Sequence, residues 1–90
     1  MKDILLSPKF FKKLKALKHK DERLTELIKK QLKLFKSSPK HHSLRLHKLQ
    51  GNLKNTWSIS INKSFRIIFT DNTEAYYFID LGFHDDIYEK

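Results

Sequence analysis

The chain has 90 residues, of which 39% are hydrophobic and 32% are charged. This length allows a single domain, residues 1–90, with one modest core, and the composition is too apolar for a disordered chain. Cysteine is absent, which excludes disulfides and thiolate metal sites and fits a reducing cytoplasm. No apolar run approaches the roughly 20 residues of a membrane span, and the apolar start is too short for a signal peptide.

The formal charge of +9 is concentrated in the first half of the chain. Residues 1–43 hold 13 Lys and Arg against 4 Asp and Glu, whereas residues 44–90 hold 6 against 6. A basic half of this size attracts polyanions with a salt-sensitive and mostly non-specific affinity. The alternative is a solvated, lysine-rich helix surface with no binding role.

The first half predicts a short strand and a helical hairpin. Residues 4–6 form the expected strand, and Ser7-Pro8 combines an N-cap with a proline at the first helical position. Apolar residues then follow at helical spacing: Phe10, Phe11, Leu14 and Leu17 in one helix, and Leu24, Leu27, Ile28, Leu34 and Phe35 in the next. Residues 18–20 are the expected joint, and residues 37–39 end the second helix.

Beyond Pro39 the hydrophobic period changes from about 3.6 to about 2 residues. The alternating residues fall into four runs: Leu44 and Leu46; Trp57, Ile59 and Ile61; Phe65, Ile67 and Phe69; Tyr77, Ile79 and Leu81. Ser58 and Ser60 indicate a strand with one buried face, Asn62-Lys63 indicates a tight turn, and Gly82 ends or bends the last strand. We therefore expect an α+β fold in which the hairpin packs on one face of a mainly antiparallel sheet and leaves the other face for a ligand.

Two residues of the second half stand out for their chemistry. His84 follows Gly82, and an unperturbed imidazole titrates near pH 6.5, about the working pH of a proton donor or acceptor. Arg66 lies in mid-strand, opposite the apolar face, and its planar fork suits phosphate oxygens. The alternatives are an ordinary surface histidine and a structural ion pair between Arg66 and Asp80.

His47 and Tyr88 are two further candidates. His47 shares a strand face with Arg45 and could act as a base or contact a phosphate, or it could be an ordinary solvated residue. Tyr88 could stack on a base, or it could close the end of the core. The neighbouring His41 and His42 lack the spacing of metal ligands, so we expect neither a metal ion nor another cofactor.

The order of these blocks resembles the RelE/ParE toxin superfamily of type II toxin–antitoxin systems, in its RelE, YafQ and YoeB branch. The resemblance covers nearly the whole chain. It rests on the Ser7-Pro8 opening with the hairpin, His47-Lys48-Leu49-Gln50-Gly51, Trp57-Ser58-Ile59, Phe65-Arg66-Ile67-Ile68-Phe69 and Gly82-Phe83-His84-Asp85-Asp86-Ile87-Tyr88. It implies a fold similar to microbial ribonucleases and a toxin that cuts messenger RNA in the ribosomal A site without a metal. It also implies a cognate antitoxin, a monomeric free toxin and a bacterial or archaeal cytoplasm.

The resemblance assigns a role to each of the four candidates. His47 matches a histidine of the YafQ-like branch that assists proton transfer, and Arg66 matches the strand arginine that RelE and YoeB use against the scissile phosphate. His84 matches the expected general acid, and Tyr88 matches a terminal aromatic residue. The remaining RNA contacts are expected from Lys48, Arg45, Lys12, Lys13, Lys29 and Lys33.

The chain also departs from the YafQ-like pattern. Ser60 and Ser64 stand where that branch places a further histidine and an aspartate, which leaves His47 as the expected general base with Lys48 stabilising charge. Asp85 or Asp86 would raise the pKa of the neighbouring His84. Two other functions stay open: a ParE-like toxin that inhibits DNA gyrase, and an inactive module that binds RNA or an antitoxin.

Overall fold

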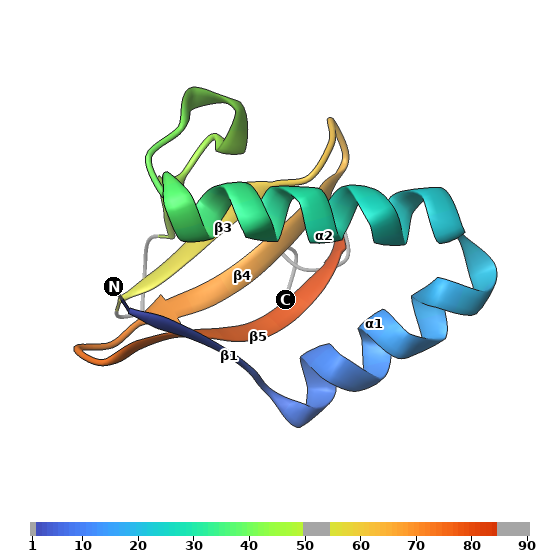
Figure 1. The fold of residues 1–90 in the computed structure, drawn as a ribbon, viewed down its shortest axis with the longest axis horizontal. Helices are drawn as coiled ribbons and strands as arrows, with labels where there is room; N and C mark the ends of the chain where they lie inside the picture. Colours follow the sequence, from blue (N-terminus) through green and yellow to red (C-terminus); the bar gives the residue numbers. More distant parts are fainter. Residues whose placement is uncertain (1, 50–54, 85–90) are drawn as a thin grey trace.

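The computed structural model describes residues 2–49 and 55–84. In chain order it contains β1 (Asp3–Leu6), α1 (Pro8–Lys20), α2 (Glu22–Ser37), a short 3-10 helix η1 (His42–Leu44), β2 (His47–Lys48), β3 (Thr56–Ser60), β4 (Phe65–Asp71) and β5 (Ala75–Phe83). The strands form one sheet in the order β1-β5-β4-β3-β2, with β1 parallel to β5 and every other pair antiparallel (Figure 1). The predicted α+β architecture is confirmed.

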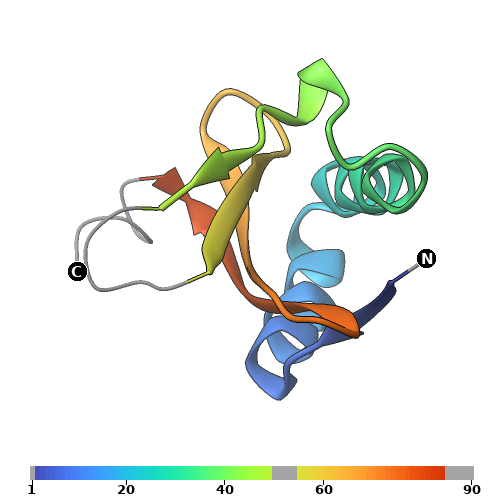
Figure 2. The same ribbon diagram turned by 90° about the vertical axis from the view of Figure 1, so that its left-hand side faces the viewer.

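Both helices lie on the same side of the sheet, so the fold has two layers (Figure 2). The core between them is rich in aromatic residues: Phe35 packs edge-on against Phe69, Tyr76 and Phe78, with ring centroids 4.8 to 5.5 Å apart. Phe10 of α1 packs on Phe78 as well. Within the described residues, neither helix is long and apolar enough to cross a membrane.

The joint between the helices is shorter and later than predicted. α1 continues through Lys20, and the single residue Asp21 separates it from α2. The Asp21 N–H donates to the Leu17 carbonyl and its carboxylate accepts from the Leu24 N–H, so Asp21 both ends α1 and caps α2. Phe11, expected in the buried stripe, is 58% exposed, because its neighbour Phe10 occupies the centre of that stripe.

Ser7 connects the start of α1 to an irregularity in β5. Its hydroxyl oxygen accepts from the Phe10 N–H, as the predicted N-cap requires. In β5, Ile68 pairs with Asp80 and Phe69 pairs with Phe78, so Ile79 is the extra residue of a β-bulge. The Ser7 hydroxyl donates to the Ile79 carbonyl at 3.2 Å, which gives the bulged peptide a partner.

The bulge changes which side chains of β5 face the helices. Phe78 and Leu81 both belong to the core, whereas Tyr77 and Ile79 are only partly buried. The strand itself was predicted, but its alternation through Tyr77, Ile79 and Leu81 is wrong because one residue is inserted in the register.

The segment after Pro39 contains less strand than predicted. Leu44 is fully buried at the end of η1, and Arg45 follows in the left-handed conformation with φ of 47°. The His41 ring caps η1 by accepting from the Ser43 N–H. These local hydrogen bonds replace the extended backbone expected for residues 44–46, so β2 begins only at His47.

Two details of the β3–β4 hairpin also differ from expectation. Ser58 and Ser60 are buried, so both faces of β3 are covered. The turn spans residues 61–64, and the side-chain oxygen of Asn62 accepts from the backbone N–H groups of Ser64 and Phe65 at 2.9 and 2.8 Å. An Asx-type turn therefore replaces the predicted two-residue connection.

Candidate active site

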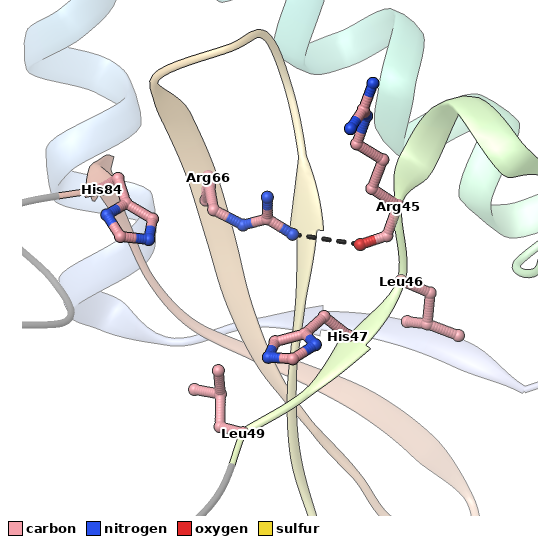
Figure 3. A pocket seen from close by; sticks show the side chains of 6 residues that line it. All are labelled: Arg45, Leu46, His47, Leu49, Arg66 and His84. Carbon is pink, nitrogen blue, oxygen red and sulfur yellow. Dashed lines mark hydrogen bonds between the residues drawn. The ribbon is translucent and has the colours of Figure 1, made fainter.

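The face of the sheet turned away from the helices carries a pocket of about 480 Å³ (Figure 3). Its lining residues are Arg45, Leu46, His47, Leu49, Arg66 and His84. Figure 3 shows the side chains of His47, Arg66 and His84 around one space, although they come from segments far apart in the sequence. The structure thus brings together three of the four predicted catalytic residues.

Strand geometry explains why these side chains share a face. Arg66 lies between the buried Phe65 and Ile67, and because side chains alternate along a strand it points away from the helices. His47 lies opposite Ser58 in the register of β2 and β3, and Ser58 lies opposite Ile68 of β4. Directly opposed residues point to the same side of a sheet, so His47, Ser58 and Ile68 share one face. Arg66 is two residues from Ile68 in β4 and therefore lies on that face as well.

Arg66 is held by two uncharged oxygen atoms. Its Nε–H donates to the Ser58 hydroxyl at 3.2 Å, and its Nη2–H donates to the Arg45 carbonyl at 3.0 Å (Figure 3). Among the described residues no carboxylate forms a salt bridge with Arg66. Its positive charge therefore remains available to an anion in the pocket.

Asp80, the suggested partner of Arg66, is instead bound by α1. Lys13 and Lys9 contact its carboxylate at 2.6 and 3.2 Å. Partial burial alone would raise the pKa of Asp80, but hydrogen bonds from Lys13, the Leu81 N–H and Lys9 outweigh it and hold that pKa below its usual value. The alternative of an Arg66–Asp80 ion pair is wrong, because both Asp80 oxygens are bound by these lysines.

The two histidines are accessible at the pocket. His84 directly follows β5, and its backbone N–H donates to the Ser64 carbonyl at 2.7 Å, which ties it to the β3–β4 turn. The side chains of His47 and His84 are exposed, and Leu49 adds a buried apolar wall. Two imidazoles beside a guanidinium can supply a proton acceptor, a proton donor and stabilisation of an oxyanion.

The structure does not place every predicted site residue at the pocket. Tyr88, Asp85 and Asp86 fall outside the described residues. Lys48 lies opposite Trp57 in the register, and its ammonium is 5.8 Å from the centre of that ring, so it does not line the pocket. A role for Lys48 in stabilising charge stays a prediction.

The predicted RNA-binding lysines of the helices belong to the layer opposite the pocket. Lys12 and Lys33 are exposed, whereas Lys13 is bound to Asp80 and Lys29 lies 3.4 Å from Glu26. None of these four lysines lines the pocket.

Ser58 is the residue of this site that sequence reasoning left without a role. Alternation had placed it on the polar face of its strand, the face that Arg66 also occupies, so a signal for it existed.

Stacked His41 and His42 rings, 4.5 Å apart, form the remaining histidine cluster. No group of three possible metal ligands occurs among residues 2–49 and 55–84.

Comparison with known proteins gives concordant results. The family model for the bacterial toxin of type II toxin–antitoxin systems, YafQ, matches residues 2–89. A candidate toxin of Methanocaldococcus jannaschii, RelE4, is 29% identical over 92 residues, which cover 100% of this chain and 94% of RelE4.

Two solved structures show the same fold. YafQ in the E. coli DinJ–YafQ complex superimposes with a TM-score of 0.82 at 19% identity, over 98% of this chain and 99% of YafQ. A YoeB/ParE toxin from Agrobacterium tumefaciens gives 0.77 at 18% identity, over 91% and 98% of the two chains.

Proposed function

Since this chain belongs to the YafQ family of bacterial type II toxin–antitoxin toxins, we propose that it is an endoribonuclease that cleaves messenger RNA on the ribosome. One observation carries the proposal: His47, Arg66 and His84 converge on one open pocket, on the sheet face that the helices leave uncovered. A guanidinium beside two imidazoles can supply the proton acceptor, the proton donor and the charge stabilisation that RNA transesterification uses.

The proposed reaction is attack of a ribose 2′-hydroxyl on the adjacent phosphate. His47 accepts the proton of the 2′-hydroxyl as the new bond to phosphorus forms. Arg66 stabilises the charge on the non-bridging oxygens, and His84 protonates the departing 5′-oxygen as its bond to phosphorus breaks. The products are a 2′,3′-cyclic phosphate and a 5′-hydroxyl. Two imidazoles supply both proton transfers, so the scheme uses no metal ion or cofactor.

Further contacts complete the proposed RNA site. Arg45 and Lys48 contact phosphates beside the cleaved bond, and Tyr88 stacks on a base or orients a sugar hydroxyl. Lysines of the two helices bind ribosomal RNA on the other side of the protein. The whole chain acts as one domain.

The proposed protein partner is a cognate antitoxin. E. coli YafQ, which shares this fold, was solved in complex with DinJ. The net charge of +9 would attract an acidic antitoxin segment as well as RNA. We propose that the free toxin is a cytoplasmic monomer and that the antitoxin covers the pocket.

Purified protein added to translating ribosomes, followed by mapping of messenger ends, tests the enzymatic proposal. We expect cuts in register with codons, and we expect His47→Ala and His84→Ala to slow cutting by at least about a hundredfold. His19→Ala is the matched control, because His19 is exposed on α1, away from the pocket.

Two results would contradict the proposal. Intact messenger together with inhibited DNA supercoiling would favour the ParE-like activity against gyrase. Intact messenger with unchanged supercoiling would favour an inactive module that binds RNA or an antitoxin.

A further inference from the structure

The two contacts of Arg66 determine which of its N–H groups a substrate can use. A guanidinium has five N–H donors fixed in one plane. The Ser58 hydroxyl occupies the Nε–H, and the Arg45 carbonyl occupies one N–H of Nη2. Three donors remain for an anion, two of them on Nη1. The two hydrogen bonds, one at Nε and one at Nη2, hold the plane of the guanidinium in place.

Both acceptors are uncharged, which separates this arrangement from a structural ion pair. A carboxylate on Arg66 would compete with an incoming phosphate for the same charge. Lys13 and Lys9 of the same protein are examples of cations in such ion pairs, because both form salt bridges with the Asp80 carboxylate. Ser58 and the Arg45 carbonyl orient Arg66 without neutralising it.

Ser58 is well suited to a fixed contact. Its side chain is fully buried in β3, between the neighbouring strands β2 and β4. Ser60 lies directly opposite Arg66 in the register, yet its hydroxyl donates to the Asn62 carbonyl at 2.8 Å instead. The strand thus carries two buried serines, and only Ser58 contacts the guanidinium.

The Arg45 carbonyl depends on an uncommon backbone conformation. Arg45 has φ of 47° and ψ of 51°, in the left-handed region that residues other than glycine adopt at a steric cost. Its N–H donates to the His42 carbonyl at 3.1 Å as η1 ends. The same residue that closes η1 therefore presents its carbonyl to Arg66.

From these contacts we propose that Ser58 and the backbone carbonyl of Arg45 are positioning groups, which hold the Arg66 guanidinium in the orientation that receives the scissile phosphate. This inference rests on the proposed ribonuclease function. Pre-orientation matters because a guanidinium that is already in place stabilises developing charge without reorganising during the reaction.

The first test compares Ser58→Ala with Ser60→Ala, since each removes one buried hydroxyl from the same strand. We expect Ser58→Ala to shift the Arg66 Nε–Hε signal in ¹⁵N NMR, to weaken binding of inorganic phosphate and to lower the cleavage rate constant about tenfold. Ser60→Ala should leave all three unchanged. Ser58→Thr, which keeps the hydroxyl, should restore the Nε–Hε signal.

The second test compares Arg45→Gly with Arg45→Val. Both variants lose the Arg45 side chain, but only glycine accepts the left-handed conformation without strain. We expect the glycine variant to retain the wild-type Arg66 signal and to cleave several-fold faster than the valine variant.

The outcomes separate this inference from the proposed function. If the wild-type protein cleaves RNA and Ser58→Ala matches Ser60→Ala in the Arg66 signal, phosphate affinity and rate, the positioning role is overturned while the ribonuclease stands. If the wild-type protein cleaves nothing, the ribonuclease proposal fails, and the Arg66 signal and the phosphate titration still decide whether these two groups orient Arg66.

Discussion

The two faces of β4 differ in what they contact, although they belong to the same strand. Phe65 and Ile67 point to the helices and are almost fully buried. Arg66, between them, points to the pocket, where it contacts one hydroxyl and one carbonyl. Alternation thus places the core residues on one side of the strand and the proposed catalytic arginine on the other. Substitutions on the two faces should therefore affect different measurements.

The largest expected effect is on the helix side, at Phe78. Its ring is fully buried against Phe10, Phe35 and Phe69. Phe78→Ala should lower the free energy of unfolding by about 3–5 kcal/mol, measured by urea denaturation. Phe83→Ala in the same strand is the control, because Phe83 is 51% exposed, and it should cost less than about 1 kcal/mol. Equal losses in both variants would contradict the assignment of the core.

Arg66 should show the opposite pattern. Arg66→Ala should lower the cleavage rate by about 10² to 10³, equivalent to about 3–4 kcal/mol of transition-state stabilisation. The free energy of unfolding should change by about 2 kcal/mol, since two hydrogen bonds to uncharged groups are lost. Arg66→Lys should recover little of the rate, because an ammonium lacks the planar fork. A lysine variant as fast as wild type would show that charge alone suffices.

Asp80 links the two layers, and its effect should be smaller. Asp80→Asn should cost about 1–2 kcal/mol of unfolding free energy at neutral pH, since a mostly buried carboxylate loses two lysine contacts. The folded-state pKa of Asp80 is lowered, so its stabilisation is fully present above the unfolded pKa and is lost as pH falls through the folded pKa.

Denaturation of both proteins across this acidic range measures the Asp80 effect. The difference between wild type and Asp80→Asn should shrink as pH decreases below about 4. A difference that stays constant down to the lowest pH would show that the carboxylate charge is not the source of the stabilisation.

The smallest expected effect on folding concerns the exposed lysines of the helices. Lys12→Ala and Lys33→Ala should each change the unfolding free energy by less than about 0.5 kcal/mol. If these lysines bind ribosomal RNA, each substitution should reduce the slope of log affinity against log salt by about 0.7–0.9. An unchanged slope in ribosome-binding experiments would leave the helix face without a role in RNA binding.

Sequence periodicity was sufficient for the α+β architecture and for the face that Arg66 occupies. Alternation around Arg66 predicted its face correctly because both of its neighbours are large and apolar. The N-cap at Ser7 was also predictable, since Ser-Pro before an apolar stripe has few other interpretations.

What periodicity could not predict were features set by tertiary contacts. The bulge at Ile79 requires a partner for its carbonyl, and that partner, Ser7, lies 72 residues away. The local turn at residues 42–45 overrides an alternating pattern because the His41 cap and the buried Leu44 favour it. The Arg45 carbonyl was missed as a partner of Arg66 because no side-chain pattern reveals a backbone acceptor, whereas alternation did place the other partner, Ser58, on the correct face.

The extra residue in β5 has a consequence for comparing this chain with its relatives. Phe78 and His84 are six residues apart, and in a regular strand an even separation would put both on the same side. Because Ile79 is inserted between them, the phase is reversed beyond it, and Phe78 enters the core while His84 lines the pocket. An alignment that preserves the Phe-to-His spacing but loses the bulge would assign the histidine to the wrong side. Relatives should therefore be matched on the position of the insertion as well as on the histidine itself.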